Sequence, residues 1–113
     1  MEQKSIPDDL TEAAGVFAAL GSEQRLLVLR ALVRAGPGGL TIGDLGVRTG
    51  VTGSTLTHHM KLLAAAGLVR QVRDGRRIIC IAADYPRMQT ISDFLLRECC
   101  ADADNSAKAH RHG

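Results

Sequence analysis

Residues 52–82 read TGSTLTHHMKLLAAAGLVRQVRDGRRIICIA, and two kinds of regular pattern follow one another in this stretch. In its first part, Leu56, Met60 and Leu63 recur at the spacing of one face of an α-helix. This periodicity predicts a helix over about 53–66 whose apolar face is buried.

The second part of the stretch is rich in β-branched residues, which is typical of strands. Two such runs, 68–73 and 76–82, flank Asp74-Gly75, a strong signal for a hairpin with a two-residue turn. The sequence therefore predicts a helix followed by a β-hairpin with an arginine-rich tip.

A second, shorter helix is predicted just upstream. Thr41 and Asp44 have the form of a capping box, which indicates a helix over about 42–48. Gly50 makes a tight turn after it, and Thr52 is suited to cap the helix that follows. A short helix, a glycine-containing turn and a longer helix together are typical of a helix-turn-helix.

Three further helices are predicted over about 9–20, 23–35 and 86–101, and Ser22 and Asp84 are expected to cap the last two. Apolar residues at helical spacing predict one apolar face on each of these last two helices. On the helix over 23–35 they are Leu26, Leu29, Leu32 and Val33. On the helix over 86–101 they are Met88, Ile91, Leu95 and Cys99.

The composition fits one folded domain. The chain has 113 residues, of which 45% are hydrophobic and 23% are charged. We place the domain at 8–101, between a polar tail at 1–7 and a tail at 102–113 that lacks large apolar residues and is expected to be flexible. No apolar run is long enough to span a membrane and no secretory signal is present, which predicts a cytoplasmic protein.

The positive charge of the chain is unevenly distributed. The net charge is only +2, but residues 53–77 contain five Lys or Arg residues against one acid, so the remainder is slightly acidic. A basic segment on an acidic body is typical of nucleic-acid binding, although an ordinary solvated surface gives the same pattern. No acid pair, nucleophile–base pair or phosphate-binding loop is present, so we do not expect an enzyme.

The helix over 53–66 also has a polar face, because Ser54, His58 and Lys61 recur at helical spacing. Such side chains reach base edges and phosphates in a major groove about 12 Å wide. His59 lies beside the apolar residues, so we expect it to be partly buried and hydrogen-bonded. The predicted contacts to double-stranded DNA are Gly53, Ser54, Thr55, Thr57, His58 and Lys61 on the helix, and Arg70, Arg73, Arg76 and Arg77 on the hairpin.

The chain resembles the ArsR/SmtB family of bacterial metalloregulatory repressors, which have the winged helix-turn-helix fold. The resemblance covers about 12–101 and is carried by residues 20–26 (LGSEQRL), 52–63, 66–69 and 74–76. It implies a mainly α fold with a small β-hairpin, and a repressor that binds an inverted-repeat operator as a homodimer through its first and last helices. The apolar residues available for that interface, unless they are buried internally, are Phe17, Leu20, Met88, Ile91 and Leu95.

The resemblance also implies an inducer site, whose position differs among family members. Residues 41–46 hold no cysteine or histidine and 84–100 hold no histidine, so two of the family's metal sites are absent. Cys99-Cys100 remains and resembles the adjacent cysteines of arsenic-responsive members. Because no third cysteine follows in 101–106, methylarsenite, which needs two thiolates, fits better than arsenite unless Cys80 or a small thiol completes the site.

Other interpretations of the cysteines stay open. Cys99 and Cys100 would form a disulfide or persulfide in a redox- or sulfide-sensing repressor. Together with His110 and His112 they offer four ligands for zinc or cadmium. Cys80 is expected to be a small buried hydrophobe. A winged-helix module that binds only other proteins is a further possibility.

Overall fold

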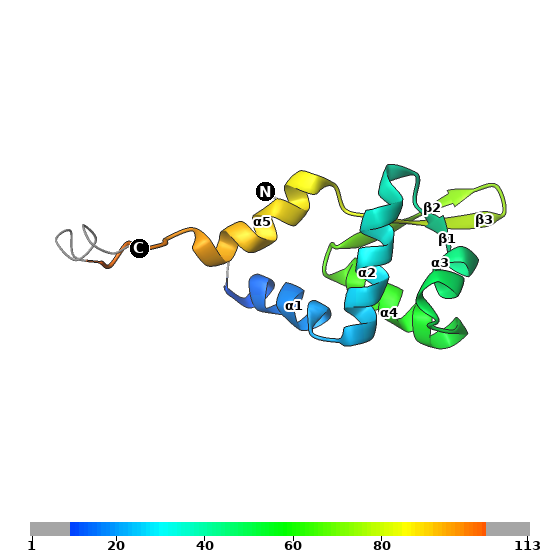
Figure 1. Cartoon of the computed structure of the whole chain (residues 1–113), viewed down its shortest axis with the longest axis horizontal. Coiled ribbons are helices and arrows are strands. Elements are labelled where there is room, and N and C mark those ends of the chain that lie inside the picture. The colour runs from blue at the N-terminus through cyan, green and yellow to red at the C-terminus, as the bar shows by residue number, and fades with distance from the viewer. Residues whose placement is uncertain (1–9, 104–113) are drawn as a thin grey trace.

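The structure, a computed structural model, describes residues 10–103 as a mainly helical chain with one small sheet (Figure 1). The elements are α1 (Leu10–Leu20), α2 (Glu23–Ala35), a 3₁₀ turn (Gly36–Gly38), β1 (Leu40–Thr41), α3 (Ile42–Thr49), α4 (Gly53–Ala65), β2 (Val69–Asp74), β3 (Arg77–Ala82) and α5 (Tyr85–Leu96). This is the winged helix-turn-helix predicted from the sequence. None of the described helices is both long and apolar enough to cross a membrane.

Side-chain caps start three of the helices, as the sequence predicts. Ser22, Thr41 and Asp84 each accept a hydrogen bond from the backbone amide three residues further on, at 3.2, 3.0 and 3.2 Å. The expectation for Thr52 is wrong. It occupies the N-cap position of α4 with extended backbone, but its side chain makes no capping hydrogen bond. The first amides of α4 therefore have no side-chain acceptor at the cap.

The sheet has three antiparallel strands in the order β1-β3-β2. Asp74 pairs with Arg77, so the two-residue turn of the hairpin is Gly75-Arg76, one residue later than predicted. Gly75 has a φ of +66°, which a two-residue hairpin turn requires and which glycine adopts without strain. Strand β1 was not predicted, because two residues are too few to show an alternating pattern.

The core lies between α2, α3, α4 and the sheet. Leu56, Met60 and Leu63 are buried, as predicted. The apolar face of α2 is only partly buried, because Leu29 and Leu32 lie in the core whereas Leu26 and Val33 are 43% and 55% exposed. The buried face of α2 is rotated by about one residue from the apolar face of its sequence, because α3 and α4 approach this helix from one direction. The largest fully buried side chains are Leu32, Leu45, Leu56, Met60, Leu63, Leu68, Val28 and Cys80.

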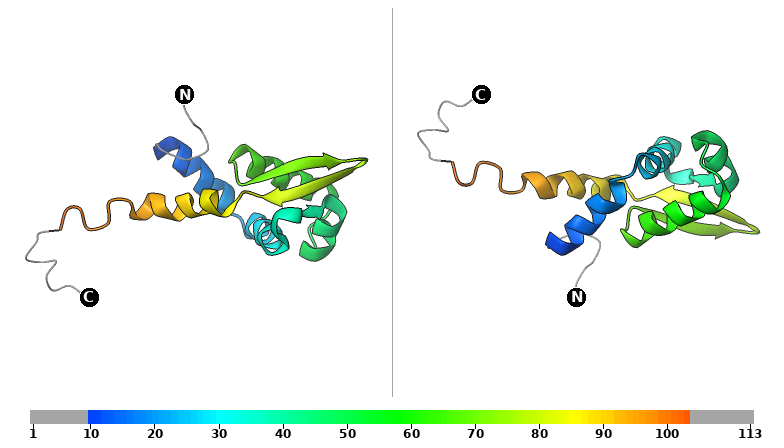
Figure 2. Two further views of the ribbon diagram at one scale, coloured as in Figure 1. Left: turned by 90° about the horizontal axis from the view of Figure 1, so that it is seen from above. Right: turned by 90° about the horizontal axis from the view of Figure 1, so that it is seen from below.

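Helix α5 is shorter than predicted. It ends at Leu96 and not near residue 101, and successive turns replace it up to Ala103. Ile91 is buried, but Leu95 is 67% exposed and Cys99 is also exposed. Figure 2 shows the end of α5 projecting away from the body, and the exposure of Leu95 and Leu96 there leaves little packing to stabilise further helical turns.

The root of α5 is fixed to the end of α4. Arg87 donates from Nη2 to the carbonyl of Ala66 and from Nε to the carbonyl of Gly67, both at 3.3 Å. A neighbouring backbone bond joins the amide of Ala83 to the carbonyl of Leu68 at 2.9 Å. Only residues 83–84 separate β3 from α5. The first turn of α5 is therefore held against the helix-turn-helix and the base of the hairpin.

Gly39 offers a direct test of how β1 joins the sheet. Its φ of +70° and ψ of −168° lie in a region that is essentially restricted to glycine. A Cβ there would also overlap the carbonyl oxygen of Cys80. We expect Gly39→Ala to lower the free energy of unfolding by roughly 2–5 kcal/mol, measured by urea denaturation.

The matched control for Gly39→Ala is Gly38→Ala, because a Cβ at Gly38 meets no atom within 4 Å. We expect the control to change the free energy of unfolding by less than about 1 kcal/mol. Equal effects of the two substitutions would contradict the close approach of Gly39 to β3.

Candidate nucleic-acid interface

Helix α4 separates its residues into two faces. The buried face carries the apolar side chains Leu56, Met60 and Leu63. The predicted DNA contacts of this helix are all exposed: Gly53, Ser54, Thr55, Thr57, His58 and Lys61. The Thr57 hydroxyl donates to the carbonyl of Gly53 at 3.2 Å, which leaves its oxygen able to accept another bond. The exposed face of α4 is therefore polar from Gly53 to Lys61, and Lys61 adds a positive charge to it.

The turn between α3 and α4 fixes the angle at which α4 is presented. Thr49 donates through its hydroxyl to the carbonyl of Leu45 at 2.8 Å and accepts from the amide of Val51 at 3.2 Å. Gly50 lies between them with a left-handed φ of +73°. The turn at Gly50 was predicted from the sequence, but the role of Thr49 was not, because a threonine inside a helix gives no distinctive signal.

His59 is the buried polar residue of α4, as predicted, with 8% of its surface exposed. Its Nε2 lies 2.8 Å from Oε1 of Gln24, and its Nδ1 lies 3.4 Å from Nη1 of Arg25. Burial lowers the pKa of His59 below its usual value, and the positive charges of Arg25 and His58 lower it further. The roles of Gln24 and Arg25 were not predicted, because their spacing from His59 along the chain follows no local pattern.

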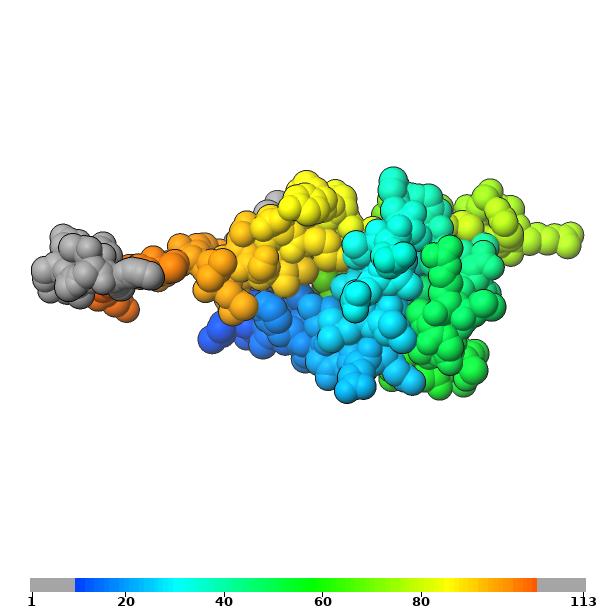
Figure 3. All heavy atoms as spheres, in the orientation of Figure 1, coloured from blue at the N-terminus to red at the C-terminus, as the bar shows by residue number. Residues whose placement is uncertain are grey.

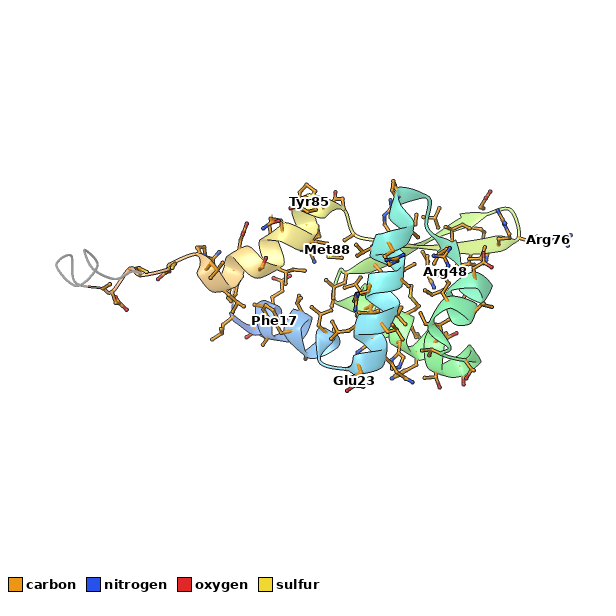
Figure 4. All side chains as sticks on the ribbon, viewed as in Figure 1. Phe17, Glu23, Arg48, Arg76, Tyr85 and Met88 are labelled. Carbon is orange, nitrogen blue, oxygen red and sulfur yellow. The ribbon has the colours of Figure 1, made fainter. Side chains whose placement is uncertain are left out.

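The four arginines of the hairpin are exposed but do not form one cluster. Arg76 lies at the tip (Figure 4), and Arg77 pairs there with Asp74 at 3.4 Å. This pair is well exposed, so it contributes little to stability. Arg73 also lies near the tip, on the same side of the sheet as Cys80, because Gln71 is opposite Cys80 in the register. Figure 3 shows the tip extending beyond the rest of the surface.

Arg70 is placed differently from the other three arginines. It is on the opposite side of the sheet from Arg73 and near the base of the hairpin. There it lines a hollow of about 630 Å³ that is also bordered by Val33, Pro37 and Tyr85. The prediction of a single basic cluster at the tip is therefore wrong for Arg70, because adjacent strand positions alternate between the two faces.

Cys99 and Cys100 lie in the turns that follow α5, and both are exposed free thiols whose sulfurs are 3.5 Å apart. Cys100 has a φ of +66°, which is uncommon for a residue with a side chain. Its hydrogen bond with the Cys99 thiol, together with the charge of that group when ionised, raises the pKa of Cys100. The guanidinium carbon of Arg97, which lies between α5 and the two cysteines in the sequence, is 5.0 Å from the centroid of the Phe94 ring.

Cys80 is fully buried on β3, as predicted. Burial raises the pKa of its thiol, and a weak hydrogen bond from Gln71, at 3.9 Å, partly opposes this. Cys80 is thus in the core, whereas Cys99 and Cys100 are on the segment that leads away from it (Figure 1). Residues 10–103 contain no group of three or more His, Cys, Asp or Glu that could hold a metal ion. His110 and His112 lie outside the described residues.

The apolar residues expected at a dimer interface are only partly available in one protomer. Phe17 on α1 and Met88 on α5 (labelled in Figure 4) pack against the core together with Leu20, and Ile91 is buried. Leu95 is exposed, as an interface residue would be in a single chain. The same two helices carry two further exposed leucines, Leu10 on α1 and Leu96 on α5, which are 77% and 63% exposed.

Comparison with known proteins identifies the kind of protein. The MarR family model matches residues 22–77. Among curated proteins, an uncharacterized HTH-type transcriptional regulator, YceK of Bacillus subtilis (strain 168), is 35% identical over 63 residues, which are 56% of this chain and 62% of that protein. The matched segments span about three fifths of the length of the curated relatives.

Solved structures match more of the chain. An ArsR-like transcriptional regulator from Rhodococcus sp. RHA1 is 30% identical, with a TM-score of 0.70 over 88% of this chain and 89% of that one. The homodimeric winged helix-turn-helix DNA-binding domain of Mb0332 from Mycobacterium bovis is 25% identical, with a TM-score of 0.62 over 90% and 89% of the two chains. The chain therefore belongs to the winged helix-turn-helix transcriptional regulators of the ArsR/MarR-like type.

Proposed function

We propose that this chain is a DNA-binding repressor that inserts α4 into the major groove of an operator and releases it on binding a trivalent arsenical. The observation that carries the DNA-binding part is the division of α4 into two faces. Its apolar face is buried, while every predicted contact residue on it is exposed. A helix held in this way can enter a groove without disturbing the core.

The start of α4 suits a phosphate. Thr52 makes no side-chain cap, so the first amides of this thirteen-residue helix can donate to a ligand. A Cβ at Gly53 would meet no atom within 4 Å, so the backbone there is open to close approach. Negative charge is favoured at a helix N-terminus, where backbone amides and the helix dipole act together. A DNA phosphate next to the groove meets these conditions.

The hairpin adds contacts to the DNA backbone. Arg73 and Arg76 have no hydrogen-bond or ion-pair partner within residues 10–103, and Arg77 is held only by its exposed pair with Asp74. Arginines at such a tip bind phosphates or a narrow minor groove and raise affinity without reading much sequence. Arg70, at the base, is the least favourably placed of the four.

We propose that two copies bind an inverted repeat, so that the two α4 helices enter major grooves about 34 Å apart. The homodimeric state of the Mb0332 domain supports this arrangement. The exposed Leu10, Leu95 and Leu96 on α1 and α5 support it as well, because a second protomer would bury them.

The proposed inducer site is the pair Cys99 and Cys100. Their sulfurs, 3.5 Å apart and exposed, are close enough for one three-coordinate arsenic atom to bridge both. Methylarsenite, CH₃As(OH)₂, would form two As–S bonds, lose two As–O bonds and release two water molecules, with no change of oxidation state. With Cys80 buried, one protomer offers only two thiols at this position, which favours methylarsenite over arsenite.

A redox- or sulfide-sensing repressor is the second candidate. The same sulfur–sulfur contact of 3.5 Å supports it, because an oxidant would convert the two thiols into a disulfide. The raised pKa of Cys100 does not separate the two candidates, because oxidation and arsenical binding both proceed through deprotonated thiols.

DNA binding should depend steeply on salt. We expect a duplex from the promoter of its own gene to bind the chain with a slope of log K against log [salt] that reflects phosphate contacts. Lys61→Ala and Arg76→Ala should each reduce that slope by about one, measured by fluorescence anisotropy. Arg30→Ala, which removes an exposed arginine of α2 from outside the proposed interface, is the matched control. Binding with no salt dependence would instead favour a module that contacts only proteins.

Methylarsenite should weaken the complex by about 5–150-fold, the usual range of allosteric coupling. The double variant Cys99→Ser, Cys100→Ser should bind the same duplex but not release it, whereas Cys80→Ala should still respond. Arsenite, zinc and peroxide are compared in parallel titrations. Release of the double variant by methylarsenite would refute the proposed site, and release of the unmodified chain by peroxide alone would favour the redox candidate.

A further inference from the structure

His59 is the one polar or charged side chain that is buried among residues 10–103. It is on α4, directly beneath the face proposed to contact DNA, and between two residues of that face, His58 and Lys61, in the sequence. Because both of its ring nitrogens have partners on α2, it is also a polar connection between α4 and the rest of the domain.

The two contacts of His59 require one protonation state. Oε1 of Gln24 accepts only, so Nε2, at 2.8 Å, must carry the hydrogen. Nη1 of Arg25 donates only, so Nδ1, at 3.4 Å, must present its lone pair. Arg25 also donates from Nε to the carbonyl of Ala19 at 2.6 Å. The neutral Nε2–H form of His59 therefore connects α4 to α2 and, through Arg25, to the end of α1.

Protonation would break this connection. A hydrogen on Nδ1 removes the lone pair that Arg25 uses and places two like charges 3.4 Å apart. The neighbouring groups do not offset this repulsion between His59 and Arg25. Gln24 is neutral, α1 contributes the carbonyl of Ala19, and His58 adds a second opposing charge with its ring centroid 6.2 Å away. Glu12 of α1 lines the same hollow as Arg25 but is not among the groups that shift the pKa of His59.

We propose that His59 is a positioning residue that holds α4 in its DNA-binding orientation, and that its protonation loosens α4 so that affinity for DNA falls as the solution becomes acidic. This inference rests on the proposed function, because it takes α4 to be the helix that enters the groove. The inference adds pH as a second signal, which acts on His59 independently of Cys99 and Cys100.

The direction of the effect follows from the lowered pKa of His59 in the folded protein. The unfolded or loosened state takes up a proton first as the pH falls below about 6.5. The state in which His59 bonds to Gln24 and Arg25 therefore loses stability as the pH falls from about 6.5 to the lowered pKa of His59 in the folded protein. His58, in contrast, is exposed on the DNA-facing side, where positive charge favours contact with phosphates.

The test is the dissociation constant for the duplex from pH 8 to pH 5.5 at constant ionic strength, by fluorescence anisotropy. We expect the affinity of the unmodified chain to fall by about three- to tenfold, since one pH unit corresponds to at most tenfold for one proton. His59→Gln retains an amide that can hydrogen-bond but cannot titrate, so its affinity should not fall. His58→Gln, the matched control on the next residue, should bind more weakly overall and still lose affinity in acid.

Circular dichroism at each pH verifies that the chain stays folded over the titration. The ¹⁵N shifts of the His59 ring give a second measurement that needs no substitution. They should report the Nε2–H tautomer at pH 8 and a titration midpoint that coincides with the loss of DNA affinity. Constant or rising affinity in acid, or the same fall in His59→Gln, would overturn the inference. Failure of the unmodified chain to bind DNA at pH 8 would instead overturn the proposed function and this inference together.

Discussion

The packing of Leu56, Met60 and Leu63 into the core is the interaction on which the rest of this structure depends. It fixes the rotation of α4 about its own axis, and that rotation determines which side chains remain outside. Because successive residues on a helix point in directions about 100° apart, burying these three positions leaves Ser54, His58 and Lys61 in solvent. The proposed recognition surface is thus a direct consequence of burying apolar residues.

Local patterns were enough to predict most of the helix-turn-helix. The apolar spacing on α4, the caps at Ser22, Thr41 and Asp84, and the hairpin signal each depend on residues close together in sequence. Where the outcome depends on distant contacts, the patterns failed. Leu26 and Val33 continue the apolar spacing of α2 yet are exposed, because the direction of packing is set by α3 and α4.

The predictions for the candidate site divide in the same way. Exposure of the α4 contacts follows from helical periodicity, so it could be predicted, as could the burial of His59 and Cys80. The partners of His59 could not, since Gln24 and Arg25 are more than thirty residues away along the chain. Nor could the end of α5 at Leu96, because the apolar spacing continues through Leu95 and Cys99 although nothing described packs on them.

Helix α5 is anchored at its first turn and projects at its other end, so it can act as a lever. Arg87 fastens the root to the carbonyls of Ala66 and Gly67, while the two cysteines lie beyond the opposite end of a twelve-residue rod about 18 Å long. A displacement at the sulfurs would therefore tilt α5 slightly, and Arg87 would transmit this tilt to the end of α4. If the proposed ligand binds the two sulfurs, it would act at the end of α5 opposite the anchored first turn, at a distance from the face of α4 proposed to contact DNA.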